Sequence, residues 1–232
     1  MQAVILAAGA GKRLRPLTNE IPKPMVAVGG EPILKYTLSI LPNEVKEVIL
    51  VVGYRGDVIK DYFGEYFNGI KLNYVRQDEP NGTGHALLCA KQFLNDDYFL
   101  LLHADDLYHP DDLANCLQGM PMIITKESPH PERFGVCIVG EKNRLIDIIE
   151  KPEHPSTNLV NVGAYLLNRE IFDIPQVYLS SGESNLVAQI GLLAKKRPVQ
   201  VIKARFWHPI GYPEDVEKAE YFIRLPAARR LN

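Results

Sequence analysis

Short runs of consecutive apolar residues alternate with longer segments through the first half of the 232-residue chain. Most of the runs are rich in Ile, Val and Leu without intervening polar residues, which is typical of strands buried on both faces. In the longer segments, apolar residues recur every three or four positions, the pattern of an amphipathic helix. We therefore predict strands at residues 3–6, 48–52, 72–75, 98–102 and 122–125, and helices at residues 33–41, 58–66, 84–94 and 110–117.

The second half has shorter turns between its apolar runs. It predicts strands at residues 134–139, 144–150 and 159–167, followed by helices at residues 183–196 and 213–225. Alternating strands and helices favour a mostly parallel sheet covered on both faces, to which the later strands are added. No linker-like stretch divides the chain, so we expect one domain over residues 1–232. The loop at residues 127–132 is rich in Pro, His and Glu and is a candidate flap over a pocket.

The strand at residues 3–6 runs into Ala-Ala-Gly-Ala-Gly at residues 7–11. Because these side chains are small, backbone N–H groups can approach and surround an oxyanion. Two prolines flank Lys23 and stiffen its segment. A run of small residues followed closely in the sequence by several cations predicts a site for a polyphosphate. The cations are Lys12, Arg13, Arg15 and Lys23.

Two common phosphate-binding loops do not fit this segment. A P-loop requires Gly at position 6 and Ser or Thr at position 13, where the chain has Leu6 and Arg13. A dinucleotide-binding loop requires a small residue at position 14, which is Leu14. The remaining alternative is a Gly-rich turn from strand to helix that binds no ligand.

A second Gly-rich segment covers residues 77–86 and leads from a strand into a helix. Its glycines allow the backbone to approach a planar ligand. Gln77 offers a donor and an acceptor, which suits the imide edge of uracil or thymine. The alternative is a surface turn with a helix cap. His85 is more typical of a hydrogen-bonded helix residue than of a catalyst, and we leave it out of the site.

Asp105 and Asp106 directly follow the strand at residues 98–102. A carboxylate at the carboxyl end of a strand, near a phosphate loop, is a suitable ligand for Mg²⁺. Asp105 is the better candidate, because we expect the next residue on a pleated segment to point away. The alternative is that one of the two carboxylates caps a turn or helix.

Two later segments contain further polar groups. Glu150 and Lys151 lie at the end of one predicted strand, and Asn161 lies near the start of the next. The Glu150 carboxylate could accept a hydrogen bond from a sugar hydroxyl, and the Lys151 ammonium could bind a phosphate. Alone, Glu-Lys-Pro is a common solvated turn. Residues 206–215 contain the only Trp and predict the end of a strand followed by an acidic helix start.

Composition narrows the class of protein. A net charge of −2 gives no general attraction to nucleic acid or to a membrane. Cys89, Cys116 and Cys137 are widely spaced, which indicates a reducing compartment and argues against a disulfide framework or a zinc site. The apolar N-terminal run is too short for a signal peptide, so we expect a cytoplasmic protein. A homo-oligomer is compatible with the sequence, which does not determine the oligomeric state.

Taken in order, these segments resemble the sugar-1-phosphate nucleotidyltransferases, which include glucose-1-phosphate thymidylyl- and uridylyltransferases and N-acetylglucosamine-1-phosphate uridylyltransferases. The most specific motifs are LAAGAGKRLRPLT and PKPM, supported by PNGTGHAL, HADDL, EKP and NVGAY. The resemblance runs from Ala3 to about Asp215. It implies a Rossmann-like three-layer α/β/α fold with a mixed, mostly parallel central sheet. It also implies a nucleotide-binding half at about residues 1–120, a sugar-phosphate half at about residues 121–232, and a reaction that forms an NDP-sugar and pyrophosphate.

The resemblance assigns roles by position. For the nucleotide it implies contacts with Ala8, Gly9, Gly11, Gln77, Gly82 and Thr83. It implies that Arg13 grips the departing phosphates, Lys23 lies at the α-phosphate, and Asp105 binds Mg²⁺. For the sugar 1-phosphate it implies contacts with Gly135, Glu150, Lys151 and Asn161. UTP or dTTP is the expected nucleotide, and a glucose or N-acetylglucosamine type the expected sugar. No general base is needed, because the attacking phosphate is already anionic.

The chain departs from the family in two places. Family members usually have W-x-D-x-G, whose Asp binds the metal, where this chain has Pro209. Either Mg²⁺ is held by Asp105, phosphates and water, with or without Asp106, or the chain is a regulatory protein that binds its ligands without turnover. Members that also acetylate carry a β-helix, whereas this sequence ends at Asn232, so we expect no such activity from it. A glycosyltransferase is a third alternative, but Asp105-Asp106 lacks the D-x-D spacing.

Overall fold

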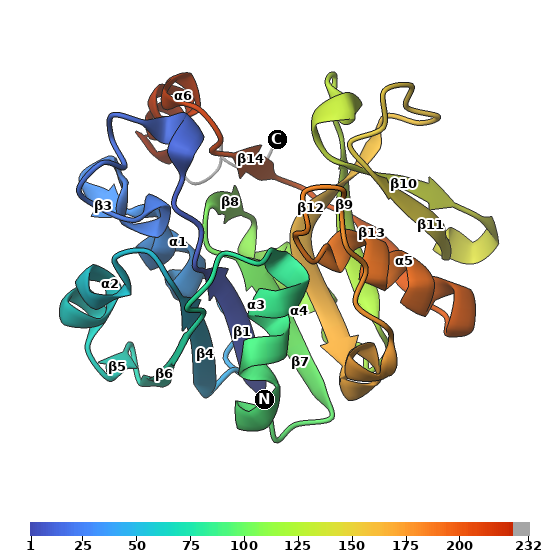
Figure 1. Cartoon of the computed structure of the whole chain (residues 1–232), viewed down its shortest axis with the longest axis horizontal. Coiled ribbons are helices and arrows are strands. Elements are labelled where there is room, and N and C mark those ends of the chain that lie inside the picture. The colour runs from blue at the N-terminus through green and yellow to red at the C-terminus, as the bar shows by residue number, and fades with distance from the viewer. Residues whose placement is uncertain (225–232) are drawn as a thin grey trace.

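The computed structural model describes residues 1–224, which build one ten-stranded sheet with helices on both faces (Figure 1). Its first part is parallel: β1 (Gln2–Ala7) lies between β4 (Glu47–Val52) and β7 (Tyr98–His103), and β6 (Ile70–Arg76) pairs with β4. These are the four strands expected first along the chain. Their carboxyl ends lie at one edge of the sheet, so the loops that follow β1 and β7 are neighbours.

The second part of the sheet is mainly antiparallel. The long strand β12 (Leu159–Asn168) pairs with β7 and joins the two parts. Strand β12 also pairs with β10 (Gly135–Val139), which forms a hairpin with β11 (Leu145–Glu150). In addition, β12 pairs with β9 (Met122–Glu127). The prediction missed β13 (Gln200–Lys203), a short polar strand that pairs with β9, and β5 (Tyr66–Phe67) at the opposite edge. The predicted α/β class with a mixed sheet is confirmed.

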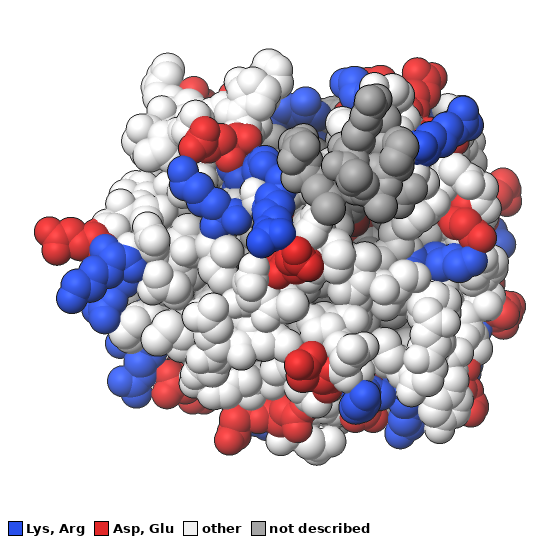
Figure 2. All heavy atoms as spheres, turned by 180° about the vertical axis from the view of Figure 1, so that it is seen from behind, with Lys and Arg blue, Asp and Glu red and all other residues white. Residues whose placement is uncertain are grey.

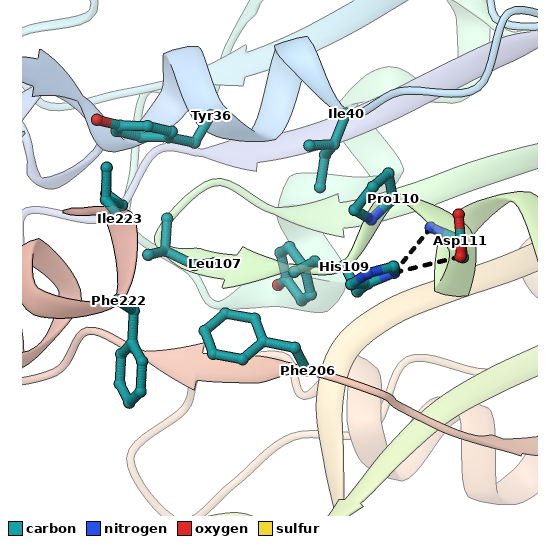
Figure 3. A pocket seen from close by; sticks show the side chains of 10 residues that line it. Tyr36, Ile40, Leu107, His109, Pro110, Asp111, Phe206, Phe222 and Ile223 are labelled. Atoms are coloured by element: carbon teal, nitrogen blue, oxygen red, sulfur yellow. Dashed lines mark hydrogen bonds and ion pairs between the residues drawn. The ribbon is translucent and has the colours of Figure 1, made fainter. Parts of the chain in front are cut away.

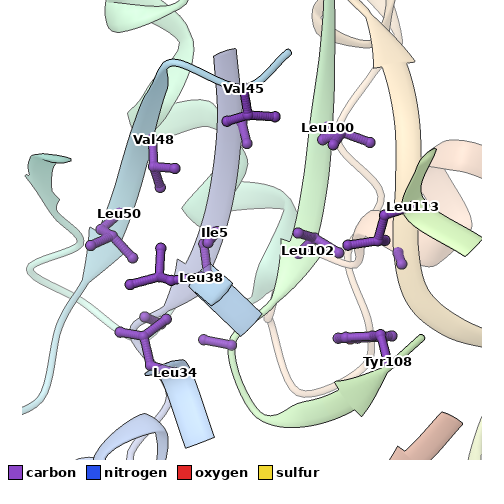
Figure 4. Close-up of a cluster of buried hydrophobic side chains, with 14 of the residues drawn as sticks. Ile5, Leu34, Leu38, Val45, Val48, Leu50, Leu100, Leu102, Tyr108 and Leu113 are labelled. Carbon is purple, nitrogen blue, oxygen red and sulfur yellow. The ribbon is translucent and has the colours of Figure 1, made fainter. Parts of the chain in front are cut away.

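Helices cover the sheet on both faces. One face packs against α1 (Ile33–Ser39), α2 (Gly56–Phe63) and α4 (Pro110–Asn115), and the other against α3 (Thr83–Ala90) and α5 (Leu186–Lys196). Because side chains alternate along a strand, Ile5 of β1 contacts the first layer and Val4 the second. In Figure 4, Ile5 lies among Leu34, Leu38 and Leu50. Burial of each such side chain contributes about 1.5–3 kcal/mol.

Several predicted boundaries are wrong by about one turn, for local reasons. Helix α2 ends at Phe63, because Gly64 has φ +64°, and Tyr66 belongs to β5. The predicted helix at residues 84–94 ends as α3 at Ala90 and continues as a 3₁₀ turn. Helix α5 starts at Leu186, because the Asn185 side chain accepts a hydrogen bond from the Ala188 N–H. The last helix, α6 (Pro213–Arg224), is present, and position 225 of that prediction lies outside the described residues.

A small ribbon connects distant parts of the chain. Strand β8 (Asp106–Tyr108) pairs with β14 (Trp207–Pro209), with Asp106 opposite Pro209. The 3₁₀ turns η1 (Lys12–Leu14), η2 (Lys23–Met25) and η4 (Pro131–Arg133) complete the surroundings of the site. On the face shown in Figure 2, positive and negative side chains are interspersed. Within residues 1–224, no helix has the length and apolar character needed to cross a membrane.

Candidate active site

Three adjoining cavities lie at the carboxyl ends of β1 and β7. The N-terminal cavity, about 400 Å³, is lined by residues 8–12, Gln77 and Gly82 among others. The C-terminal cavity, about 330 Å³, is lined by β10, β12 and residues 207–211. The junction cavity, about 260 Å³, lies between them and is lined by Arg13 and Lys23. Asp105 lines all three, and every residue to which the resemblance assigns a role lines at least one of them. Of the four cations expected around a polyphosphate, Lys12, Arg13 and Lys23 line these cavities, whereas Arg15 lines none.

A fourth cavity of about 430 Å³ shares no lining residue with these three. Figure 3 shows that Leu107, Phe206, Phe222 and Ile223 face it, and that His109 contacts Asp111 at its margin. Its lining is mainly apolar. Since no Lys or Arg of residues 1–224 lines this cavity, it is not the candidate site for a phosphate.

The loop after β1 forms the wall of the N-terminal cavity with its backbone. Gly11 has φ +62°, and a Cβ atom there would lie 2.8 Å from the Cβ of Lys23. Glycine at this position therefore lets the Lys23 segment pack against the loop. The Thr18 hydroxyl donates to the Gly11 carbonyl at 2.8 Å and fixes the turn. Gly9, in contrast, has no heavy atom within 4 Å of where its Cβ would be, so it faces open space.

Gln77 is buried, and its carboxamide nitrogen is engaged by the protein. It donates to the Gly82 carbonyl at 3.0 Å and lies 3.1 Å from Nδ1 of His85. Within residues 1–224 no hydrogen bond engages the Gln77 oxygen, so a ligand would meet an acceptor and not the donor–acceptor pair expected from the sequence. His85, which we left out, helps to orient this side chain.

The reason for glycine at position 82 also differs from the prediction. Gly82 has φ +91°, and a Cβ atom there would lie 2.2 Å from the backbone oxygen of Ser184. The glycine is therefore required by the close approach of another chain segment, and not only by a ligand. The adjacent Thr83 hydroxyl accepts from the Leu186 N–H at 3.2 Å, which joins α3 to α5.

At the junction, Lys23 and Asp105 form an ion pair of 2.5 Å. Burial alone would raise the pKa of Asp105, but the positive charge and hydrogen bond of Lys23, together with His103 and a backbone hydrogen bond, hold this pKa below its ordinary value. Burial lowers the pKa of the neighbouring His103, which favours its neutral form. The junction therefore presents an ionised carboxylate beside an ammonium group.

The residues present fit a magnesium ion held by one protein carboxylate. Asp106 also lines the C-terminal cavity, although we expected the residue after Asp105 to point away from the site. Both oxygens of its carboxylate already accept hydrogen bonds. Oδ2 accepts one from Trp207 Nε1 at 2.9 Å, and Oδ1 accepts one from the Ile210 N–H at 3.2 Å. Burial, and next the charge of Asp105, raise the pKa of Asp106 to about 7. Pro209 supplies no side-chain oxygen. Residues 1–224 contain no cluster of three His, Cys, Asp or Glu ligands, so substrate phosphates would complete the coordination.

In the C-terminal cavity, several predicted residues form ion pairs or hydrogen bonds within the protein. Lys151 lies 3.4 Å from the carboxylate of Glu150. Asn161 is buried, donates from Nδ2 to the Tyr165 hydroxyl at 2.6 Å, and accepts from the Gly163 N–H at 2.9 Å. These bonds hold the irregular stretch of β12 between Asn161 and Tyr165. Asn161 therefore shapes the cavity wall as well as lining it.

The sequence analysis missed several lining residues. Arg133 lies one position beyond the predicted flap, and Asp215 was assigned only to the start of a helix. The Asp215 carboxylate accepts from the backbone N–H groups of Gly211 (3.0 Å) and Tyr212 (2.9 Å), which fixes the loop before α6. The missed residues of the C-terminal cavity include His103, Arg133, Phe134, Asn185, Trp207, Gly211 and Asp215.

Solved structures similar to this chain have the same fold. A UDP-glucose pyrophosphorylase complexed with UDP-glucose superposes with a TM-score of 0.85 at 23% identity, covering 97% of this chain and 99% of that one. A putative glucose-1-phosphate thymidylyltransferase from Bacillus anthracis superposes with a TM-score of 0.84 at 24% identity, covering 97% and 96% of the two chains. They confirm the expected arrangement of layers.

Sequence comparison agrees with the motifs. The bifunctional protein GlmU of Methanocaldococcus jannaschii is 38% identical over 226 residues, which are 96% of this chain and 54% of the relative. The UTP–glucose-1-phosphate uridylyltransferase AglF of Haloferax volcanii is 34% identical, covering 95% of both chains. The chain thus spans about half the length of the GlmU relatives. The family model described as nucleotidyl transferase matches residues 2–224, and the chain belongs to that family.

Proposed function

We propose that the protein transfers a nucleotidyl group from UTP or dTTP to a sugar 1-phosphate of the glucose or N-acetylglucosamine type, forming an NDP-sugar and pyrophosphate. The observation that carries the proposal is the continuous row of cavities, with Asp105 lining all three and Arg13 and Lys23 at the junction. Two anionic substrates can meet there end to end. The name of the AglF relative, a uridylyltransferase, and the family description support a transferase over a regulatory protein.

The chemistry requires positioning and positive charge. An oxygen of the sugar phosphate attacks the α-phosphorus of the nucleotide, and the bond from that phosphorus to the β-phosphate bridging oxygen breaks. Lys23 and Arg13 stabilise the charge that develops on the phosphates, and Lys151 holds the incoming phosphate. Asp105 is the residue that would hold Mg²⁺, which supplies further positive charge when bound. No proton has to be removed, so neutral His103 is not needed as a base.

The proposed base preference rests on the Gln77 oxygen. This acceptor can pair with the N3–H of uracil or thymine, whereas N3 of cytosine is itself an acceptor. UTP and dTTP share this edge, so both remain candidates. We also propose a cytoplasmic location, which the three free cysteines support.

The test is a matrix of nucleoside triphosphates against sugar 1-phosphates, with pyrophosphate release as the measured quantity. Turnover with UTP or dTTP and a glucose or N-acetylglucosamine phosphate supports the proposal. A clear preference for CTP, ATP or GTP contradicts the base assignment. Tight ligand binding without turnover at any Mg²⁺ concentration would instead establish the regulatory alternative.

A further inference from the structure

Two arginines that line the C-terminal cavity, from segments far apart in the sequence, lie over one aromatic ring. The guanidinium carbon of Arg13, in η1, is 5.2 Å from the ring centroid of Tyr212. That of Arg133, in η4, is 4.8 Å from the same centroid. Three segments far apart in the sequence therefore meet beside the C-terminal cavity. A cation over an aromatic face is attracted by the ring, which can align both guanidinium groups.

The other charged side chains of the C-terminal cavity already have partners within the protein. Lys23 is paired with Asp105, and Lys151 with Glu150. Among the remaining carboxylates, Asp106 and Asp215 accept hydrogen bonds from backbone N–H groups, and Asp106 also accepts one from an indole.

The two arginines differ from these groups. Neither Arg13 nor Arg133 forms an ion pair with a carboxylate anywhere in residues 1–224. Both arginines line the C-terminal cavity, so an anion bound there would meet two positive charges that no described carboxylate neutralises. Guanidinium groups also match phosphate oxygens with paired N–H donors.

We propose that Arg133, aligned with Arg13 by Tyr212, forms a two-guanidinium site for the β- and γ-phosphates of the nucleotide and hence for the departing pyrophosphate. This inference rests on the proposed function. Gly211, the neighbour of Tyr212, lines both the C-terminal and the junction cavity, which places the ring beside Arg13 at the phosphate end of the nucleotide site. In this arrangement Lys151 binds the incoming sugar phosphate.

The surroundings hold this pair in place. The Asp215 carboxylate fixes the backbone of Tyr212, as described above. Phe134, next to Arg133, packs edge-on against Trp207 with ring centroids 5.0 Å apart, and the Arg133 guanidinium lies 6.0 Å from the Phe134 ring. The Arg133 side chain is itself exposed, so its removal should not disturb folding.

The test measures pyrophosphate binding by calorimetry on the full chain, together with initial rates in both directions. For Arg133→Ala we expect the Kd for pyrophosphate to rise roughly ten- to hundredfold, the scale of one lost charged hydrogen-bonding partner. The KM for the sugar 1-phosphate should stay within about twofold. Arg133→Lys should fall between wild type and Arg133→Ala, because an ammonium lacks the paired donors. Arg144→Ala is the matched control: Arg144 is exposed and lines none of the three cavities, so pyrophosphate binding should not change.

The ring has its own test. Tyr212→Phe keeps the aromatic face and should bind pyrophosphate like wild type, whereas Tyr212→Leu should weaken binding about tenfold. Thermal unfolding checks that each variant is folded. If Arg133→Ala binds pyrophosphate as wild type does, or changes only the KM for the sugar 1-phosphate, the inference is wrong. The proposed function still stands in that case, provided the wild-type protein shows turnover. A wild-type protein that neither binds pyrophosphate nor turns over contradicts the proposed function itself.

Discussion

The N-terminal and C-terminal cavities differ in the chain segments that build them. Many of the residues that line the N-terminal cavity belong to two short segments, residues 8–12 after β1 and residues 77–83 after β6, in which glycines bring the backbone close to the cavity. The C-terminal cavity is lined by charged side chains from segments far apart in the sequence, namely Arg13, Lys23, Asp105, Asp106, Arg133, Glu150, Lys151 and Asp215. Lys23 pairs with Asp105 and Lys151 with Glu150, whereas Arg13 and Arg133 have no carboxylate partner within residues 1–224. One side therefore depends on local chain geometry, and the other on contacts between distant segments.

The difference has a consequence for substitutions. Backbone N–H groups cannot be removed by changing a side chain, so the N-terminal cavity is sensitive mainly where an added Cβ atom would collide with the protein. The C-terminal cavity and the junction are sensitive wherever one partner of a charge pair is lost. Asp105 and Lys23 lie where the two cavities meet, and we expect the largest effects there.

Asp105→Asn should abolish metal-dependent turnover. Pro209 has no side-chain oxygen and both oxygens of Asp106 are engaged, so no second carboxylate can replace Asp105. Rates measured over a range of Mg²⁺ concentrations, with a chelator-treated wild type for reference, provide the check. A variant with normal rates and an unchanged Mg²⁺ requirement would show that the two cavities do not share a metal ligand at Asp105.

Arg13→Ala and Lys23→Ala should each lower turnover by at least about a hundredfold, the scale of one lost partner for transition-state charge. Their effects on folding should differ. Arg13 has no ion pair with a described carboxylate, so the free energy of unfolding should change by about 0.5 kcal/mol or less. The Lys23 side chain is only 12% exposed and neutralises Asp105, so its loss should cost more.

Turnover and denaturant unfolding, measured on the same samples, separate these two effects. Near-normal activity of either variant would contradict the assignment of phosphate-binding residues. Equal stability losses would contradict the distinction between the paired and the unpaired cation.

Gly82→Ala and Gly9→Ala compare two glycines of the N-terminal cavity. At position 82 an added methyl group would collide with the Ser184 backbone, so we expect a loss of stability of about 1–3 kcal/mol. At position 9 it would enter open space, so stability should be unchanged while the KM for the nucleotide rises about tenfold, the range of one lost backbone contact. Thermal unfolding and nucleotide KM values test both. A stability loss at Gly9 equal to that at Gly82 would contradict this comparison.

The smallest effect is expected for Pro209→Asp. A carboxylate at this position should lower the Mg²⁺ concentration for half-maximal rate by a few-fold, provided the chain keeps its conformation without proline. The measurement is the rate as a function of Mg²⁺, with Pro213→Ala at the start of α6 as a control for the loss of a proline. An unchanged requirement means that the side chain at 209 does not face the metal. Turnover that appears only in the variant supports the regulatory alternative.

The sequence was sufficient for features that depend on neighbours along the chain. Consecutive apolar residues predicted β1, β4 and β7, because a buried strand needs no partner-specific pattern to be recognised. The small residues and cations of the loop after β1 predicted an anion site, because both lie within one short segment. Local signals also set the approximate positions of the helices, although caps and positive-φ glycines moved their ends.

Tertiary structure alone decided the features that need two distant segments. The pairing of Asp106 with the Trp207 segment spans 101 residues, and it determines that this carboxylate is not free. In the same way, Ser184 explains glycine at position 82, and Tyr212 brings Arg13 and Arg133 together. Such contacts leave no periodic pattern in the sequence, because each depends on the path of the whole sheet. Hydrophobic patterning predicts which residues are buried, whereas the partners of a buried polar group follow only from how the chain closes on itself.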